Sequence, residues 1–374
     1  MKTEVKQICT NCILDSEISD ILFNDDGVCN YCLTYREQAG KELLNTVPRE
    51  FELNRIVDAM KKKGRGKNYD CIIGLSGGVD SSYVALLTKR LGLRALAVHL
   101  DNGWNSEISV KNIKNIVEKL GLDLHTHVID WEEFKDLQVA FLKAGVVDIE
   151  LLTDHAISAI MYHMARKEKV DYFISGYNLV TEGIMPANWS YAKWDRKNIL
   201  AIHSLFGQKE LKTYPTYSLI TKILGEFKYK TFRLLNYVEY NKQKVIEELI
   251  DELGWQSYGG KHHESIFTKF YQSYILPKKF GIDKRKAHIS NLICSSQMTR
   301  EQGLEEILKP IYNSMDECES EIEYVVKKLG LKRSDFDKYM SEPAVSHLYY
   351  PNGQRMNNFL KSIKRIVVAK QGND

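Results

Sequence analysis

Long apolar runs are missing from this sequence of 374 residues. No stretch approaches the roughly 18 consecutive apolar residues that a membrane-spanning helix needs. No apolar core of a signal peptide follows the charged residues 1–4. The sequence also lacks a large excess of charge of one sign, because its formal net charge is only +3. We therefore expect a cytoplasmic protein with neither a membrane nor a nucleic acid as its partner.

The composition is that of a packed globular protein. The apolar fraction of 44% and the charged fraction of 27% are both close to the averages of soluble proteins. Neither disorder nor a fibrous structure is indicated. The length predicts two domains, or one large domain with attachments.

Four of the seven cysteines lie near the N-terminus in two C-x-x-C pairs, which are Cys9 with Cys12 and Cys29 with Cys32. The sixteen residues between the pairs fit the spacing of a zinc-binding knuckle. Four thiolates would close a tetrahedral site with no position for water, which predicts a structural zinc ion. Two reducible disulfides or an iron–sulfur cluster are the alternatives. The other three cysteines, Cys71, Cys294 and Cys318, are expected to be ordinary thiols.

From about residue 70, short apolar runs alternate with longer amphipathic stretches. This alternation is typical of a parallel sheet flanked by helices. Strands are predicted over residues 70–75, 94–100, 124–129 and 170–175. Helices are predicted over residues 81–91, ended by Gly92, and over residues 110–120.

A glycine loop stands at the first junction between a strand and a helix. Residues 76–82 read Ser-Gly-Gly-Val-Asp-Ser-Ser. Two adjacent glycines allow backbone amides to close around a phosphate at the start of a helix. The loop is not a Walker A motif, because the Lys-Ser/Thr ending is missing. Asp80 can lie beside phosphates only if magnesium or a proton screens the repulsion. A serine- and glycine-rich turn without function is the alternative.

The loop resembles the PP-loop of the ATP pyrophosphatase superfamily, whose pattern Ser-Gly-Gly-x-Asp-Ser is matched at every position. That family cleaves ATP between its α and β phosphates. The resemblance implies an adenine nucleotide alpha hydrolase-like fold, with ATP and Mg²⁺ as cofactors. It implies these nucleotide-binding residues: Ser76, Gly77, Gly78, Asp80, Ser81, Ser82, Val98, Leu100, Asp101, Gly176 and Asn178.

Two of the implied positions have a plain alternative. The residues after the second strand, 101–103, are explained nearly as well by a strand-ending turn. Glu182 belongs to residues 175–183, which look like the family's second phosphate-side segment, and it would complete a magnesium site with Asp80. Glu182 would otherwise cap or solvate the start of a helix.

A closer resemblance covers nearly the whole chain. The cysteine knuckle, residues 258–265 (Tyr-Gly-Gly-Lys-His-His-Glu-Ser) and residues 286–301 resemble the N-acetyl sugar amidotransferases of surface-polysaccharide and O-antigen biosynthesis. Those are related to the synthetase domain of asparagine synthetases. The resemblance implies conversion of a sugar acetamido group to an acetamidino group through an O-adenylyl imidate. Catalysis would involve Asp80, Lys261 as a mobile cation, and His262 or His263 for a proton of ammonia.

The expected partners follow from this chemistry. The substrate is an N-acetylated sugar, and the basic residues 278–286 favour a nucleotide-linked or acidic one. A separate glutaminase subunit supplies ammonia, because the early cysteines are taken up by metal. The expected domains are a zinc knuckle over residues 1–45, an ATP-binding α/β domain over 46–185 and a helix-rich substrate-binding region over 186–374. A PP-loop tRNA thiolation enzyme and a non-catalytic zinc-bearing adaptor are the rival functions.

Overall fold

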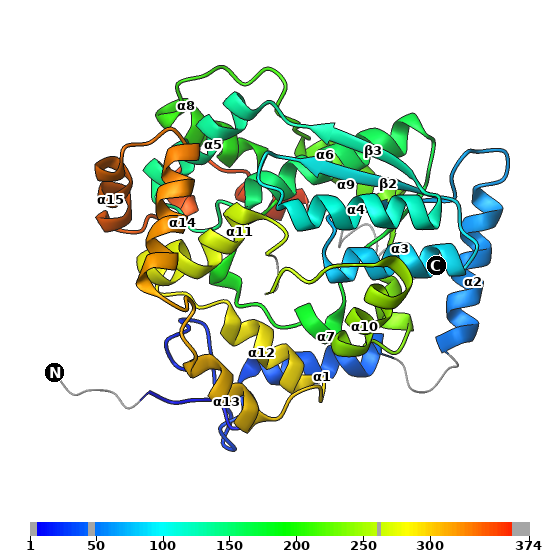
Figure 1. Ribbon diagram of the computed structural model, residues 1–374, viewed down its shortest axis with the longest axis horizontal. Helices are drawn as coiled ribbons and strands as arrows, with labels where there is room; N and C mark the ends of the chain where they lie inside the picture. Colours follow the sequence, from blue (N-terminus) through cyan, green and yellow to red (C-terminus); the bar gives the residue numbers. More distant parts are fainter. Residues whose placement is uncertain (1–5, 44–48, 260–262, 361–374) are drawn as a thin grey trace.

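A five-stranded parallel sheet forms the centre of the computed structural model, which describes residues 6–43, 49–259 and 263–360 (Figure 1). The strand order is β3-β2-β1-β4-β5, and every neighbouring pair is parallel. The chain therefore reverses its direction of winding between β1 and β4, which is where open parallel sheets bind ligands. The strands are β1 (Cys71–Gly74), β2 (Ala95–Asp101), β3 (Asp123–Val128), β4 (Tyr172–Ile174) and β5 (Lys230–Phe232).

Helices cover both faces of the sheet because alternate strand residues point to opposite sides. On one side Ile72 and Leu96 join the core cluster of α5 (Trp131–Ala144) and α6 (Leu151–Lys167). On the other side the cluster contains Ile73 of β1 together with residues of α2 (Arg49–Lys63), α3 (Val79–Arg90), α4 (Glu107–Leu120) and α10 (Lys242–Leu253). Figure 1 shows these two helical layers around the sheet.

The first four strands confirm the predicted ranges to within about two residues, a usual discrepancy for element ends. The fifth strand was not predicted, because its three residues Lys-Thr-Phe carry no apolar run. It pairs with β4 at the edge of the sheet. The sheet thus crosses residue 185, where we expected the α/β domain to end, and the three-part division of the chain stays a proposal.

The two predicted helices are present with different starts. The first begins at Val79 because the glycine loop leads directly into it, and Gly92 follows its end with a φ of +65°. The second begins at Glu107, three residues before the predicted start, because the Ser106 hydroxyl accepts a hydrogen bond from the backbone N–H of Ser109.

The other helices of four or more residues, apart from the short 3-10 helix Leu234–Tyr237, lie before, between and after these sheet-flanking elements in the chain. They are α1 (Asn30–Glu42), α7 (Leu179–Glu182), α8 (Arg196–Phe206), α9 (Leu219–Lys228), α11 (Ile266–Phe270), the π-helix η3 (Tyr271–Phe280), α12 (Arg285–Cys294), α13 (Arg300–Leu308), α14 (Met315–Lys328) and α15 (Arg333–Ser341). Figure 1 shows the blue N-terminal segment beside α12 and α13. The Arg300 guanidinium fixes this contact by donating to the carbonyl oxygens of Cys9 and Cys12 at 3.0 and 3.1 Å.

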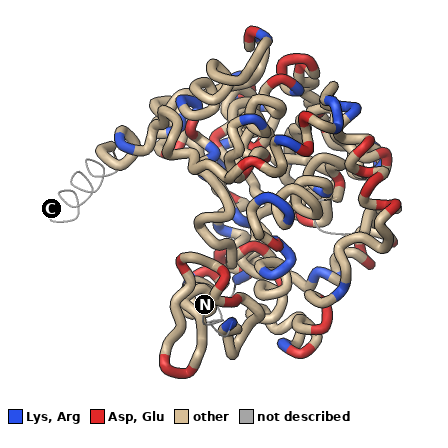
Figure 2. The backbone as a smooth tube through the Cα atoms, turned by 90° about the vertical axis from the view of Figure 1, so that its left-hand side faces the viewer, with Lys and Arg blue, Asp and Glu red and all other residues tan. Residues whose placement is uncertain are grey.

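Charges of both signs are interspersed along the backbone (Figure 2). This distribution agrees with the small net charge of +3. Within the described ranges, no helix combines the length and the apolar character that crossing a bilayer requires.

Candidate nucleotide site

The glycine loop is held in place by contacts from outside it. Gly77 has a φ of +79°, which L-residues rarely adopt, and a Cβ atom there would lie 2.6 Å from the carbonyl oxygen of Ser109. The indole N–H of Trp255 donates to the Gly77 carbonyl oxygen at 3.0 Å. The position therefore requires glycine for both its backbone conformation and its close packing against α4.

The hydroxyl groups of the three loop serines have different hydrogen-bond partners. The Ser76 hydroxyl accepts from the backbone N–H of Gly78 at 3.2 Å and lies 3.1 Å from the Ser81 hydroxyl. The Ser82 side chain is fully buried and donates to the Gly78 carbonyl oxygen at 2.7 Å. Ser76 and Ser81 therefore line the site, whereas the Ser82 hydroxyl, which we expected to bind nucleotide, is turned into the helix.

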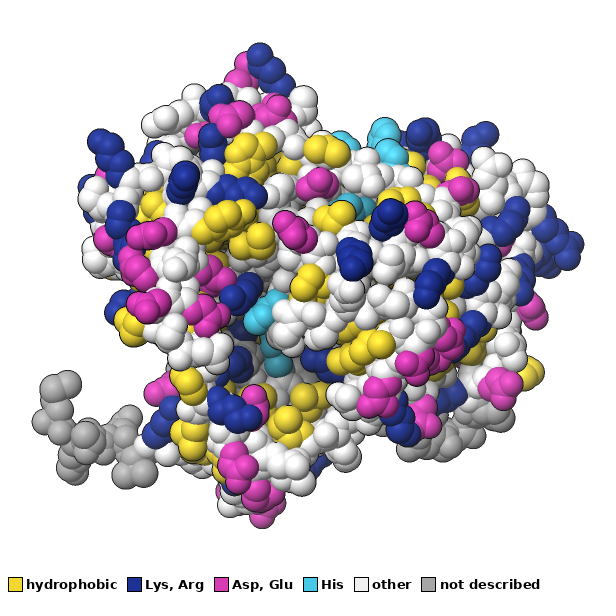
Figure 3. Space-filling model, in the orientation of Figure 1, with side chains coloured by type: hydrophobic (Ala, Val, Ile, Leu, Met, Phe, Trp, Pro, Cys, Tyr) yellow, Lys and Arg dark blue, Asp and Glu magenta, His cyan; other side chains and the backbone are white. Residues whose placement is uncertain are grey.

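Two adjoining cavities flank the loop. A small cavity of about 220 Å³ lies over the start of α3, and a central cavity of about 530 Å³ lies at the ends of β1 and β2. They share the residues Ser76, Ser81, Gly176, Tyr177 and Glu264. Both lie between β1 and β4, at the reversal point of the sheet. In the orientation of Figure 1, the space-filling view shows a hollow near the centre of this face (Figure 3).

The small cavity brings two predicted metal ligands together. Asp80 and Glu182 both line it, with Lys242 as a cation on the same wall. Asp80 is positioned by the side chain of Asn178, which donates to it at 3.3 Å, and by the hydroxyl of Tyr240. The pKa of Tyr240 is raised by burial and by the Asp80 carboxylate, so its hydroxyl stays protonated and donates. Oxygen ligands of this kind fit Mg²⁺.

The central cavity contains the predicted adenine-side residues Val98 and Leu100. Asp101 does not line it, because its carboxylate accepts from the Gly103 N–H and the Asn105 amide at 3.0 and 3.1 Å. This is the strand-ending turn named as an alternative. His99, which lies between Val98 and Leu100 in the strand, also lines the cavity. It bridges β2 to the loop, since its Nδ1 lies 2.9 Å from the Leu75 carbonyl oxygen.

The basic side chains of residues 278–286 that have resolved contacts are paired within the protein, and their preference for a nucleotide-linked or acidic sugar stays a prediction. Lys279 donates to the carbonyl oxygen of Glu342 at 2.7 Å, and Lys284 lies 3.3 Å from Glu150. Arg285 and Lys286 form ion pairs with Asp283, Asp15 and Glu17. Internal carboxylates and carbonyls therefore neutralise the positive charge that the sequence displays. The proposed catalytic residues Lys261 and His262 lie outside the described residues.

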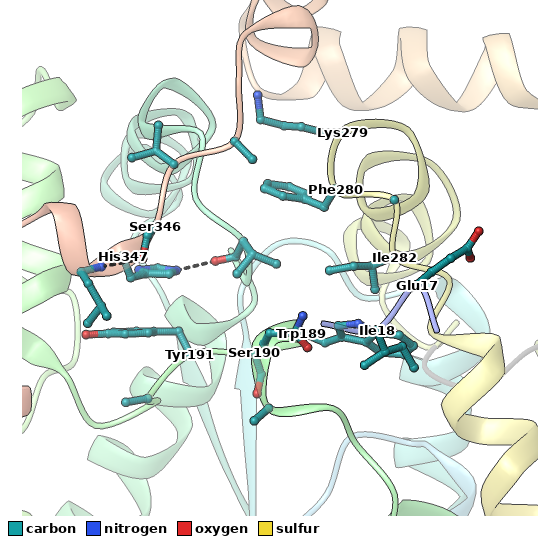
Figure 4. A pocket seen from close by; sticks show the side chains of 18 of the residues that line it. Glu17, Ile18, Trp189, Ser190, Tyr191, Lys279, Phe280, Ile282, Ser346 and His347 are labelled. Carbon is teal, nitrogen blue, oxygen red and sulfur yellow. Dashed lines mark hydrogen bonds between the residues drawn. The ribbon is translucent and has the colours of Figure 1, made fainter. Parts of the chain in front are cut away.

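A third, outer cavity of about 1010 Å³ contains no residue of the glycine loop. Figure 4 shows its side chains coming from segments far apart in the chain, with Glu17 and Ile18 facing Tyr191 and His347 across the opening. Residues that are close together in the chain line this outer cavity and the central cavity. Val147, Ala192 and Asp283 line the outer cavity, and their near neighbours along the chain, Glu150, Lys193 and Lys284, line the central one.

The N-terminal cysteines form a compact cluster. The four Sγ atoms lie within 4.8 Å of one another and the four side chains are fully buried. None of the seven cysteines takes part in a disulfide. Backbone N–H groups of Cys12 and Cys29 donate to the Cys9 sulfur at 3.4 and 3.2 Å, as they do to metal-bound thiolates. The donor set and its closed geometry fit a zinc ion. No second group of three or more metal-ligating side chains occurs among residues 6–43, 49–259 and 263–360.

Two parts of the chain match known families. Residues 52–168, which contain the loop, match the family described as NAD synthase. Residues 264–364 match the LPS biosynthesis protein WbpG-like, C-terminal domain. The chain therefore contains an NAD synthase-like PP-loop domain. The PP-loop domain and the C-terminal match together link the chain to ligases and to polysaccharide biosynthesis.

Curated relatives match the PP-loop domain over part of their length. A glutamine-hydrolyzing GMP synthase of Pyrobaculum aerophilum is 34% identical over 104 residues, covering 27% of this chain and 19% of the relative. A probable mitochondrial tRNA-specific 2-thiouridylase 1 of Caenorhabditis elegans is 24% identical over 235 residues, covering 55% of this chain and 59% of the relative. The chain thus spans less than two thirds of these relatives. The NH3-dependent NAD synthetase of Campylobacter jejuni superimposes with a TM-score of 0.29 at 16% identity, covering 56% of this chain and 94% of that structure.

His155 of α6, a fully buried side chain, makes the stability of the PP-loop domain sensitive to acid. Its Nε2 accepts from the Tyr217 N–H at 3.3 Å, so Nδ1–H donates to the Lys193 carbonyl oxygen at 2.8 Å. Burial lowers the pKa of His155 from 6.5 to about 4. The unfolded chain therefore takes up the proton first, and the stabilisation is complete above pH 6.5 and lost as the pH falls towards 4.

We expect the wild type to lose about 2 kcal/mol of unfolding free energy between pH 7.5 and 5 through this group. His155→Gln can keep one donor and one acceptor but has no titrating ring, so its loss over the same range is smaller by that amount. Urea denaturation of both proteins at the two pH values measures the difference. Equal losses in the two proteins would contradict the assignment.

Proposed function

We propose that the chain is an ATP-dependent amidotransferase that converts an acetamido group of a sugar to an acetamidino group. The observation that carries this proposal is a PP-loop with a polar cavity on either side, in the same chain as a stretch similar to a polysaccharide-biosynthesis protein. The small cavity suits the two outer phosphates of ATP. The larger, central cavity has room for a nucleoside and an acceptor.

In the first step the carbonyl oxygen of the acetamido group attacks the α-phosphorus of ATP, and pyrophosphate leaves. The charge on the phosphates is opposed by the loop amides, the Ser76 and Ser81 hydroxyls and the ammonium of Lys242. Asp80 and Glu182 would hold Mg²⁺, which supplies further neutralisation of the phosphates when bound. Lys261 is proposed from the resemblance as an additional, mobile cation.

In the second step ammonia adds to the imidate carbon and AMP leaves. Ammonia is nucleophilic only without its extra proton, and His262 or His263 is proposed to take a proton after the addition. A separate glutaminase is the proposed ammonia source. None of the cysteines outside the cluster is suited to release ammonia here, since Cys71, Cys294 and Cys318 line none of the cavities described above. The GMP synthase relative is described as glutamine-hydrolyzing, which supports glutamine as the origin of the ammonia.

The decisive assay supplies ATP and ammonium with a panel of N-acetylated sugars, free and nucleotide-linked. We expect AMP and pyrophosphate in equal amounts, and mass spectrometry should find one sugar in which NH has replaced oxygen. Formation of ADP, or AMP without a modified sugar, would contradict the proposal. Addition of a candidate glutaminase with glutamine in place of ammonium tests the partner.

A tRNA thiolation enzyme is the second candidate, favoured by the thiouridylase relative. Such an enzyme needs a sulfur-carrying cysteine near the ATP site. Cys71 is fully buried inside β1, and burial raises the pKa of its thiol, which makes it unreactive. In the same assay, a Cys71→Ser/Cys294→Ser/Cys318→Ser variant that retains pyrophosphate release removes this candidate. Pyrophosphate release by the wild type removes the non-catalytic adaptor.

A further inference from the structure

Part of the lining of the central cavity consists of charged side chains of both signs. Lys193 lies 2.8 Å from Asp148 and 3.0 Å from Asp154. Lys284 lies 3.3 Å from Glu150. Apart from Asp148, which lies behind Lys193, these four side chains line the same cavity as Ser76 and Ser81. We call Glu150, Asp154, Lys193 and Lys284 the mixed-charge wall.

Asp148, the carboxylate that holds Lys193 of the mixed-charge wall, occupies a costly position. Asp148 is 1% exposed, and its φ of +67° places a non-glycine residue in the left-handed region. A buried ion pair is often no more stabilising than apolar side chains of the same size, because both charges lose their water. Three separate segments, around residues 148–154, 193 and 284, bring their charges to one surface of the cavity. Such an arrangement indicates a ligand on that surface.

The charges of this wall identify the chemical class of the ligand. Both lysine ammonium groups are already held by carboxylates, and the three carboxylates Asp148, Asp154 and Glu150 outnumber the two lysines. A phosphate or diphosphate, which needs surplus positive charge, is therefore disfavoured here. Hydroxyl and amide groups, which both donate and accept, match alternating carboxylates and ammonium groups. The amide of Gln272, which donates to Glu150 at 3.1 Å, extends the same pattern.

We infer that the mixed-charge wall is the subsite for the sugar ring of the acceptor, with its hydroxyl and acylamino groups held by Glu150, Asp154, Lys193 and Lys284. Any nucleotide linked to that sugar lies outside this wall. The inference rests on the proposed function for the identity of the acceptor. It adds which residues bind the sugar ring, and it places the ring in the same cavity as Ser76 and Ser81 of the PP-loop.

Ligand-observed saturation-transfer NMR tests the subsite without turnover. The probes are UDP-N-acetylglucosamine and UDP-N-acetylgalactosamine, with α,β-methylene-ATP present so that uridine cannot occupy the ATP site. We expect the sugar-ring and acetyl protons to receive more saturation than the uridine protons. Glu150→Gln/Lys284→Met removes both charges of one pair together, which avoids an unpaired buried charge, and should weaken probe binding about tenfold.

Lys286→Met is the matched control. Lys286 is 15% exposed and paired with carboxylates, as Lys284 is at 13%, but it lines the outer cavity. This variant should bind the probes within about twofold of the wild type. Three results would overturn the inference: stronger saturation of uridine, equal weakening in the control, or no ring saturation with either probe. Because no chemistry is measured, a failed amidination assay would leave this result standing on its own.

Discussion

Asp80→Ala is expected to reduce pyrophosphate release by about 100-fold or more, because the site loses the carboxylate that would hold the metal against the phosphates. The zinc content of the protein should not change. Asp80→Asn is the cleaner variant, since its amide oxygen can still accept from the Tyr240 hydroxyl while the charge is gone. Pyrophosphate release and zinc are measured on the same preparations.

Asp316→Asn is the control for this experiment. Asp316, like Asp80, is an acidic residue in the first turn of a helix, but it lies on α14 and lines neither cavity of the PP-loop. The Asp316→Asn variant should release pyrophosphate at the rate of the wild type. Full activity in Asp80→Asn would contradict the metal-binding role, and a loss of zinc in that variant would point to misfolding.

Cys29→Ser is expected to abolish zinc binding and to release the N-terminal module from the rest of the protein. A structural zinc site contributes its binding energy to folding, so the module should lose on the order of 5 kcal/mol or more. Without the metal, only a few buried apolar side chains, such as Leu14, Ile18 and Tyr35, remain to hold this short segment. Limited proteolysis should then cut within residues 6–43 before it cuts the sheet, and elemental analysis should find no zinc.

Cys318→Ser controls for the loss of a thiol as such. Cys318 is a half-buried cysteine of α14 that does not belong to the cluster. The Cys318→Ser variant should bind one zinc ion per chain and resist proteolysis like the wild type. If Cys29→Ser retained its zinc, or if the sheet were cut first, the structural role of the cluster would be wrong.

The parts of the site that could be read from the sequence are those whose residues are neighbours along the chain. The loop residues 76–82 follow an apolar strand and precede a helix, so their position at the edge of a parallel sheet was predictable. The spacing of the four cysteines likewise predicted the cluster that the structure contains. The strand β5 was missed because three residues carry no periodicity.

Other features depended on contacts between distant residues. Tyr240 binds Asp80 from 160 positions away, and nothing in its local sequence indicates this. The sequence predicts that the Ser82 hydroxyl donates a hydrogen bond to a phosphate. In the structure this hydroxyl donates to the Gly78 carbonyl oxygen at the start of α3 instead. Lys284 and Lys286 read as a basic surface until the fold supplies Glu150, Asp15 and Glu17 as their partners.

The sequence by itself determined the glycine loop, the cysteine cluster and the type of sheet, because backbone conformation and ligand spacing are set by residues close together in the chain. Only the tertiary structure decided what surrounds the loop. The cavity walls combine segments more than 100 residues apart, such as the loop itself with Lys193 and Lys284. Whether such a charge meets a ligand or an internal partner depends on packing, since an ion pair forms only where both groups are brought within a few ångströms.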